Sequence, residues 1–237
     1  MPCQREAVEA IGFDLDYTLW DQDAFALSFF DAIALEYGRR LGWGRQQVAR
    51  ACRDALARLT LAHPCLFDHV LHQLGAWDPR LVAELVQRYH QHRPPAEPYP
   101  GAERALCQLR QAGFRLFLVT DGHGPTQRHK VAALGLGRHF DPMVFTGDFP
   151  EQRRKPDPFP FRLACARMGL GPERCAYVGD NPACDFQGPL GLGMLTIGVS
   201  TGPFAGMAVP PEQAPQLRVA GLDELAGLLV GTAQGAL

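Results

Sequence analysis

The sequence has no CxxC pair, although it contains seven cysteines, at positions 3, 52, 65, 107, 165, 175 and 184. An odd number of cysteines without metal-ligand spacing argues against both a disulfide framework and a structural zinc site. No apolar run approaches the roughly 20 residues that span a bilayer, and the first twelve residues lack the apolar stretch of a signal peptide. We therefore expect a soluble protein of a reducing cytoplasm that does not act at a membrane.

Lysine is scarce as well, because only Lys130 and Lys155 are lysines among the 23 basic residues. The net charge of −2 provides no overall positive field, which argues against a dedicated nucleic-acid-binding protein. In contrast, hydrophobic residues make up 46% of the 237 residues and charged residues 20%. This composition supports a buried core and excludes a chain that is disordered throughout. The length suits one medium-sized domain, or a core that carries a smaller insertion.

Short apolar runs alternate with helical patterns over most of the chain. The apolar runs cover residues 7–13, 114–119, 143–146, 175–179 and 194–199, and the helical patterns cover 102–111, 127–134, 159–168, 182–190 and 222–230. Apolar runs without polar alternation are typical of parallel strands that are buried on both faces. The alternation therefore predicts an α/β fold, with a Rossmann-like three-layer core and a mostly parallel sheet.

Residues 20–98 interrupt this alternation and contain no convincing strand. Apolar residues recur there at helical spacing, which predicts four amphipathic helices. The pair Asp78 and Pro79 predicts the start of the fourth helix, because Asp is a favoured N-cap and Pro is favoured in the first turn. The sequence thus predicts a discontinuous core, residues 1–19 and 99–237, with an inserted all-α domain at 20–98.

Polar groups follow the predicted strands, where ligands of open α/β sheets bind. Asp14, Asp16 and Thr18 follow the first strand, and side chains two residues apart on an extended segment point the same way. The second strand is followed by Thr120-Asp121-Gly122, and the fourth by Gly179-Asp180-Asn181 with Asp185 five residues after Asp180. Lys155 precedes the helical pattern at 159–168.

Each of these segments is equally compatible with an ordinary capped turn when it is taken alone. Together they bring acidic, hydroxyl and cationic groups to one edge of one sheet. Several carboxylates beside a lysine suit a site that holds Mg²⁺ and binds a phosphoryl group.

The order DxDxT, T-D-G, K-P and GDNxxxD resembles the haloacid dehalogenase-like phosphohydrolase superfamily. The resemblance covers the predicted core, and the helical insertion resembles the C1-type cap that closes over the site in that superfamily. It implies a Mg²⁺-dependent phosphatase that hydrolyses a small phosphorylated metabolite through an aspartyl-phosphate intermediate. The implied partner is a small-molecule phosphate ester, and the substrate and oligomeric state are left open.

The resemblance also implies roles for the first and last motifs. Asp14 would be the nucleophile and a metal ligand. Asp16 would be the general acid and base, with its backbone carbonyl as a metal ligand. Asp180 would complete the protein ligands of the metal, while Asp185 and Thr18 would support these ligands from behind.

The middle motifs would hold the phosphoryl group. The resemblance implies that Thr120 and the Gly122 amide bind phosphoryl oxygens, and that Lys155 stabilises developing charge and orients Asp14. The resemblance also places Asp121 among the substrate-binding residues with Thr120 and Gly122, although many relatives have Asn at this position and Asp121 adds a carboxylate there.

Two alternative functions are left open by the sequence. A phosphomutase of the same superfamily keeps both aspartates of the first motif, whereas a dehalogenase lacks the second, which is Asp16 here. A non-catalytic phosphate-binding or regulatory protein on the same scaffold usually loses a catalytic carboxylate, and this sequence retains the full set.

Overall fold

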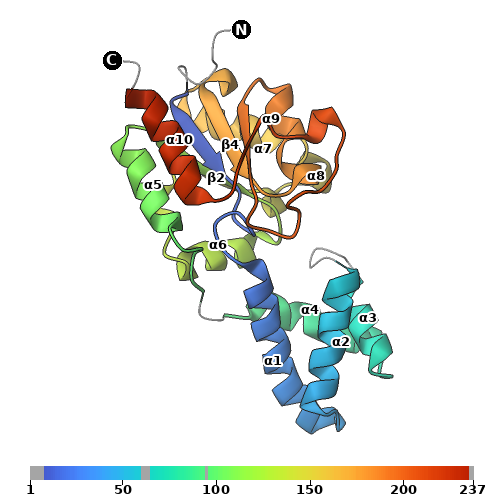
Figure 1. Ribbon diagram of the computed structural model, residues 1–237. Helices are drawn as coiled ribbons and strands as arrows, with labels where there is room; N and C mark the ends of the chain where they lie inside the picture. Colours follow the sequence, from blue (N-terminus) through green and yellow to red (C-terminus); the bar gives the residue numbers. More distant parts are fainter. Residues whose placement is uncertain (1–7, 60–64, 94–95, 235–237) are drawn as a thin grey trace. The chain divides into compact units, whose positions relative to one another are not determined.

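The protein is seen here in a computed structural model that describes residues 8–59, 65–93 and 96–234 (Figure 1). Its contacts divide the chain into two compact units, one formed by residues 1–21 and 97–237 and the other by 22–96. Trp20 and Pro98 form an isolated antiparallel bridge at the end of the first segment and the start of the second. The chain therefore leaves the larger unit and re-enters it at one place.

The larger unit is built on a six-stranded sheet in the order β3-β2-β1-β4-β5-β6. The strands are β1 (Ala10–Phe13), β2 (Arg115–Thr120), β3 (Met143–Phe145), β4 (Cys175–Gly179), β5 (Leu195–Val199) and β6 (Leu217–Val219). All five neighbouring pairs are parallel. The strand order reverses direction at β1, and such switch points are where open α/β sheets bind their ligands.

Helices cover both faces of this sheet (Figure 1). They are α5 (Ala102–Gln111), α6 (Gly124–Ala133), α7 (Phe159–Met168), α8 (Pro182–Asp185), α9 (Gln187–Gly191) and α10 (Leu222–Gln234). Helices α5 and α10 pack side by side on one face, and α7 packs on β2 and β3. Phe161 of α7 contacts the ring of Tyr177 on β4 edge to face, with centroids 4.8 Å apart. The fold class predicted from the sequence is confirmed.

Besides differences of up to four residues at the ends of β1, β2, β3, β5 and α10, the structure differs from the sequence prediction at the following elements. Helix α6 begins at Gly124 rather than at residue 127, because Pro125 occupies its first turn, where a missing N–H costs nothing. The helix predicted at 182–190 is two short helices, α8 and α9, with Phe186 between them. Strand β6 was not predicted.

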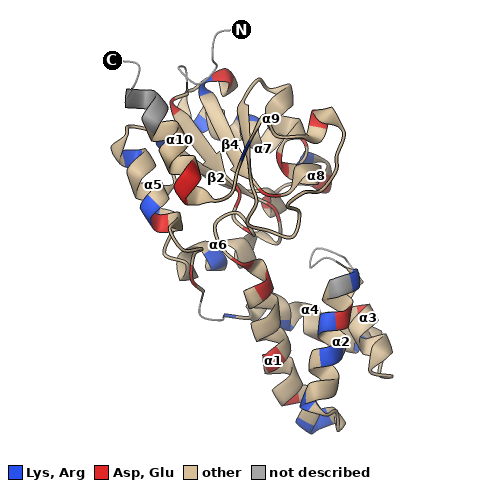
Figure 2. Ribbon diagram, in the orientation of Figure 1, with Lys and Arg blue, Asp and Glu red and all other residues tan. Residues whose placement is uncertain are grey.

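The smaller unit consists of four helices: α1 (Gln22–Leu41), α2 (Arg45–Arg58), α3 (Leu66–Gln73) and α4 (Pro79–Gln91). They share one core, in which Phe29 packs against Phe30, Phe67 and Tyr89. The Asp78 side chain accepts the Arg80 N–H, so the predicted N-cap of α4 is present. Figure 2 shows acidic and basic segments interspersed along α1 and α2, as expected for solvated faces.

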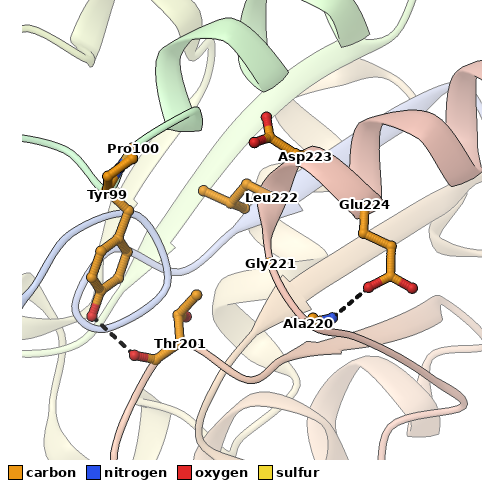
Figure 3. A pocket seen from close by; sticks show the side chains of 8 residues that line it. All are labelled: Tyr99, Pro100, Thr201, Ala220, Gly221, Leu222, Asp223 and Glu224. Atoms are coloured by element: carbon orange, nitrogen blue, oxygen red, sulfur yellow. Dashed lines mark hydrogen bonds between the residues drawn. The ribbon is translucent and has the colours of Figure 1, made fainter.

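A pocket of about 370 Å³ lies beside the start of α10, lined by Tyr99, Pro100, Thr201 and residues 220–224 (Figure 3). It contains none of the predicted site residues. The six cysteines of the described ranges are free, and Cys3 lies outside these ranges. Among residues 8–59, 65–93 and 96–234, no helix is both long and apolar enough to cross a bilayer.

Candidate active site

Asp14 lies directly after β1, at the switch point of the sheet. Its backbone N–H donates to the Val178 carbonyl at 2.9 Å, which extends the pairing of β1 with β4 by one residue. The Lys155 ammonium donates to Asp14 Oδ1 at 2.7 Å and to Asp185 Oδ1 at 2.7 Å. All three side chains are buried. Because a buried ammonium is costly unless it is paired, the two carboxylates hold Lys155 at this position.

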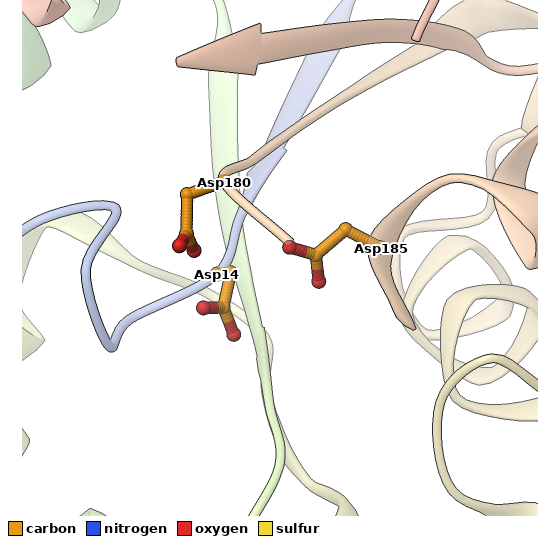
Figure 4. A group of neighbouring side chains, drawn as sticks. All are labelled: Asp14, Asp180 and Asp185. Carbon is orange, nitrogen blue, oxygen red and sulfur yellow. The ribbon is translucent and has the colours of Figure 1, made fainter. Parts of the chain in front are cut away.

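Three carboxylates converge at the carboxyl ends of β1 and β4 (Figure 4). Asp14 follows β1, Asp180 follows β4, and Asp185 ends α8. One oxygen from each lies within 4.8 Å of the others, and all three residues are buried. Hard oxygen ligands at this spacing suit a divalent cation such as Mg²⁺.

The crowding of these carboxylates changes their acidity. Burial raises the pKa of Asp14 to about 7; Asp185 and Asp16 add to the rise, and Lys155 opposes it. Burial also raises the pKa of Asp180 to about 9, with Asp185 and Asp14 adding to the rise. For Lys155, burial disfavours the charged form, but the adjacent carboxylates outweigh burial and raise its pKa well above the usual value. Asp14 and Asp180 thus hold protons to higher pH than usual, because three ionised carboxylates would carry more negative charge than Lys155 alone neutralises.

Asp180 has one oxygen that is left for a ligand. Its Oδ1 accepts a hydrogen bond from the Thr18 hydroxyl at 3.1 Å. Its Oδ2 is buried and has no hydrogen-bond partner among the residues that the structure describes. Gly202 lies over this oxygen, and a Cβ at that position would be 2.5 Å from Oδ2. A bound cation would satisfy an oxygen that is otherwise costly to bury, so the residues present fit the metal that the sequence predicts.

Asp185 differs from the other two carboxylates because both of its oxygens have protein partners. Oδ1 accepts from Lys155, and Oδ2 accepts the Asn181 backbone N–H at 2.9 Å. These contacts tie α8 to the lysine and to the loop after β4. The arrangement is compatible with the supporting role predicted for Asp185.

The Asp16 side chain is held by donors outside the three-carboxylate cluster. Lys130 Nζ donates to both of its oxygens, each at 2.9 Å, and Gln127 Nε2 donates to Oδ2 at 2.9 Å. Trp20 Nε1 donates to Oδ1 at 2.8 Å. Lys130 and Gln127 were not predicted as site residues from the sequence. The scarcity of lysine was the one signal that pointed to Lys130.

The turn at Tyr17 lets Asp16 and Thr18 contact different parts of the site. Tyr17 adopts a left-handed conformation with φ of 58°, which is uncommon for a residue with a side chain. The Thr201 hydroxyl donates to the Tyr17 carbonyl at 2.5 Å and thereby fixes the turn. Asp16 consequently faces α6, while Thr18 reaches Asp180.

The segment after β2 brings Thr120, Asp121 and Gly122 to the same sheet edge. Thr120 is buried, and its Oγ1 accepts from Gln127 Nε2 at 2.7 Å. Gly122 has φ of 116°, a conformation that favours glycine. Asp121 directs Oδ1 toward protein groups, since it accepts from the Thr146 hydroxyl and, at 3.4 Å, from the Lys155 backbone N–H. Its contacts thus join the loop after β2 to the segment that carries Lys155.

The comparisons with known proteins agree with this geometry. The model of the haloacid dehalogenase-like hydrolase family matches residues 8–193. The chain is 32% identical over 205 residues to a glyceraldehyde 3-phosphate phosphatase of Methanopyrus kandleri, covering 84% of this chain and 87% of that protein. It is 34% identical over 160 residues to a phosphoserine phosphatase of Thermus thermophilus, covering 68% of this chain and 62% of that protein.

The fold also has solved counterparts. The crystal structure of a HAD phosphatase from Thermococcus onnurineus superposes with a TM-score of 0.62 and 21% identity. The match covers 94% of this chain and 98% of the Thermococcus chain. At that identity the likeness shows the fold alone. The match of the family model and the curated relatives carry the assignment: the chain belongs to the haloacid dehalogenase-like hydrolase family and is a phosphatase acting on phosphate esters.

Proposed function

We propose that this phosphatase is Mg²⁺-dependent and hydrolyses a small phosphorylated metabolite through an aspartyl-phosphate on Asp14. The observation that carries the proposal is the convergence of Asp14, Asp180 and Asp185 around Lys155, with a buried Asp180 oxygen facing the cluster. In such a site, Lys155 and a bound cation would neutralise the charge of the phosphoryl dianion, which would allow the Asp14 carboxylate to approach it.

Asp14 and Asp180 would hold the metal, together with the backbone carbonyl of Asp16. When bound, the cation supplies Lewis-acid neutralisation of phosphoryl oxygens. Asp185 would remain behind them, because both of its oxygens already bind protein groups. Thr18 would orient Asp180 through its hydroxyl.

In the first half of the reaction, an Asp14 oxygen attacks phosphorus and the bond from phosphorus to the leaving oxygen breaks. Lys155, 2.7 Å from Asp14 Oδ1, keeps the carboxylate oriented and reduces the repulsion between two anions. Thr120 and the Gly122 amide would donate to phosphoryl oxygens. Asp121 would hold the loop that presents them, through its contacts with Thr146 and the Lys155 backbone.

Asp16 would move the protons. As the bond to the leaving group breaks, it donates a proton to the departing alkoxide. In the second half it accepts a proton from the water that attacks the phosphoryl group on Asp14. Inorganic phosphate and the free carboxylate of Asp14 result, and Asp16 is again ready to donate.

The relatives indicate the substrate class. They are named as phosphatases of glyceraldehyde 3-phosphate, of phosphoserine and of the 9-phosphate of N-acylneuraminate. Each of these molecules is a small polar compound phosphorylated on a primary alcohol. We propose a substrate of this class, with glyceraldehyde 3-phosphate as the first to test, because five of the relatives carry that name at 27–32% identity.

The test measures phosphate release from these esters with Mg²⁺ and with a chelator, for the wild type and for Asp14→Asn. We expect Mg²⁺-dependent release that falls on the order of a thousandfold or more in the variant, as expected when a nucleophile is removed. Asp223→Asn is the matched control, since Asp223 is an exposed carboxylate paired with Arg104. Turnover by Asp14→Asn at the wild-type rate would contradict the mechanism, and isomerisation without phosphate release would indicate a mutase.

A further inference from the structure

Asp16 is held by an unusually complete set of hydrogen-bond donors. Oδ1 accepts from Trp20 Nε1 at 2.8 Å and from Lys130 Nζ at 2.9 Å. Oδ2 accepts from Gln127 Nε2 and from Lys130 Nζ, each at 2.9 Å. These three donor groups contact both oxygens, so they define the orientation of the carboxylate plane as well as its position.

Two of these donors come from α6 and are themselves buried. Gln127 and Lys130 are three residues apart, so they lie on one face of the helix, and their exposed fractions are 2% and 5%. The Lys130 ammonium also lies 5.5 Å from the centre of the Trp20 ring. Burying an ion pair is a weak source of stability, because desolvation offsets the attraction between the charges. A stabilising role alone is therefore a poor explanation for a lysine at this position.

Gln127 connects Asp16 to the predicted phosphoryl-binding hydroxyl. Its Nε2 group donates to Asp16 Oδ2 at 2.9 Å and to Thr120 Oγ1 at 2.7 Å. Since the Thr120 oxygen accepts from Gln127, its own hydrogen must point elsewhere. Its distance to the Asp121 carbonyl oxygen is 3.5 Å, which is long for a hydroxyl donor. Gln127 thus leaves the Thr120 hydroxyl available to donate to a ligand.

We propose that Gln127 and Lys130 are positioning residues for catalysis: Lys130 orients Asp16 for proton transfer, and Gln127 sets the orientation of Asp16 relative to Thr120. This assignment rests on the proposed function. Neither residue contacts the reacting phosphorus, and both act through the groups that do. Misplacing a reacting group by about 1 Å can cost on the order of a hundredfold in rate.

The proposal predicts a loss that depends on the leaving group. An alkoxide needs a proton from Asp16 as its bond to phosphorus breaks, whereas p-nitrophenolate leaves as a stable anion without one. Water attack on the aspartyl-phosphate needs Asp16 as a base whichever group has left. Formation of the phosphoenzyme from p-nitrophenyl phosphate is therefore the one step that does not use Asp16.

The experiment compares wild type with Lys130→Met and Gln127→Leu, which keep approximate side-chain volume and remove the donors. For glycerol 1-phosphate, we expect kcat to fall by about 10- to 100-fold in each variant, with KM within about threefold of wild type. For p-nitrophenyl phosphate in a single turnover, we expect release of p-nitrophenolate within about threefold of wild type. Arg128→Met is the matched control, because the exposed Arg128 on the same helix pairs with Asp148; it should match wild type in both assays.

The outcomes separate this assignment from the function on which it rests. A folded Lys130→Met or Gln127→Leu with wild-type kcat on glycerol 1-phosphate overturns the assignment, as does a loss in the p-nitrophenyl phosphate single turnover equal to the loss in kcat on glycerol 1-phosphate. If Lys130→Met does not fold, the same criteria applied to Gln127→Leu decide. Absence of phosphate release by the wild-type enzyme from any ester, with Asp14→Asn no different, overturns the proposed function itself.

Discussion

The crowded carboxylates predict that the metal-free protein loses stability as the pH rises from 5.5 to 7.5. A carboxyl group whose pKa is higher in the folded than in the unfolded state binds more protons when folded, so rising pH favours unfolding. Asp180 has an ordinary pKa of 3.8 and one of about 9 in the folded protein. Both pH values lie between these limits, and the full slope therefore applies over the interval.

The magnitude follows from the slope of about 1.4 kcal/mol per pH unit for one group. Over two pH units, Asp180 alone lowers the free energy of unfolding by roughly 3 kcal/mol. Asp14, whose pKa is raised to about 7, acts in the same direction over the lower part of the interval. For a chain of this length, a loss of that order corresponds to a melting temperature roughly 6–12 °C lower at the higher pH.

The assay is thermal unfolding in a chelator at the two pH values, for wild type and Asp180→Asn. Burial lowers the pKa of His92 and His139, so they contribute a dependence of opposite sign in both proteins. Comparing the two proteins removes this contribution. We expect the pH-dependent loss to be clearly smaller in Asp180→Asn, and saturating Mg²⁺ to restore wild-type stability mainly at pH 7.5.

One result would refute this reasoning directly. If metal-free wild type and Asp180→Asn lose the same stability between the two pH values, the Asp180 carboxyl does not titrate as its surroundings require. The Asp14, Asp180 and Asp185 carboxylates would then not repel one another strongly enough to favour the binding of a cation.

Two further predictions concern glycines whose missing side chains the structure uses. Gly202→Ala places a Cβ 2.5 Å from Asp180 Oδ2, and we expect the Mg²⁺ affinity measured by calorimetry to fall roughly 10- to 100-fold. Gly191→Ala is the control, because a Cβ at Gly191 would meet no other atom within 4 Å. Unchanged affinity in Gly202→Ala would exclude a metal at Asp180 Oδ2. Gly12→Ala places a Cβ 2.3 Å from the Phe117 ring, and we expect urea unfolding to show a loss of about 1–3 kcal/mol, which a wild-type midpoint would contradict.

Much of the fold could be predicted from local patterns. The bounds of β4, α5 and α7 match the prediction. Strand β4 is a continuous apolar run, and α5 and α7 have a helical periodicity that ends shortly before Gly113 and at Gly169. Strand β6 has three residues, of which only Val219 is buried, and a segment that short carries no periodicity. The break at Phe186 has a local cause that the prediction overlooked: Pro189 lacks the N–H that a continuous helix would donate to the Asp185 carbonyl.

The candidate site likewise has residues that could be predicted from the sequence and residues that could not. The sequence placed Asp14, Asp180 and Lys155 at one sheet edge because strand ends in a parallel sheet converge. The contacts of Asp16 with α6 could not be predicted from the sequence. Lys130 is 114 residues away from Asp16, and the pattern of its helix indicates no partner for it. The left-handed Tyr17 that turns Asp16 toward α6 likewise has no signature, because residues with side chains rarely adopt that conformation.

The bridge between Trp20 and Pro98 has a consequence for how such a protein can diversify. The Tyr99 N–H donates to the Leu19 carbonyl at 2.8 Å, so the two crossing segments stay joined on the larger unit. An insertion whose ends are neighbours can be lengthened, shortened or exchanged without moving a strand of the sheet. Changes confined to residues 22–96 can therefore leave the geometry of the carboxylates intact, and we expect a chimera that grafts another helical insertion between Asp21 and Glu97 to keep the fold of the larger unit.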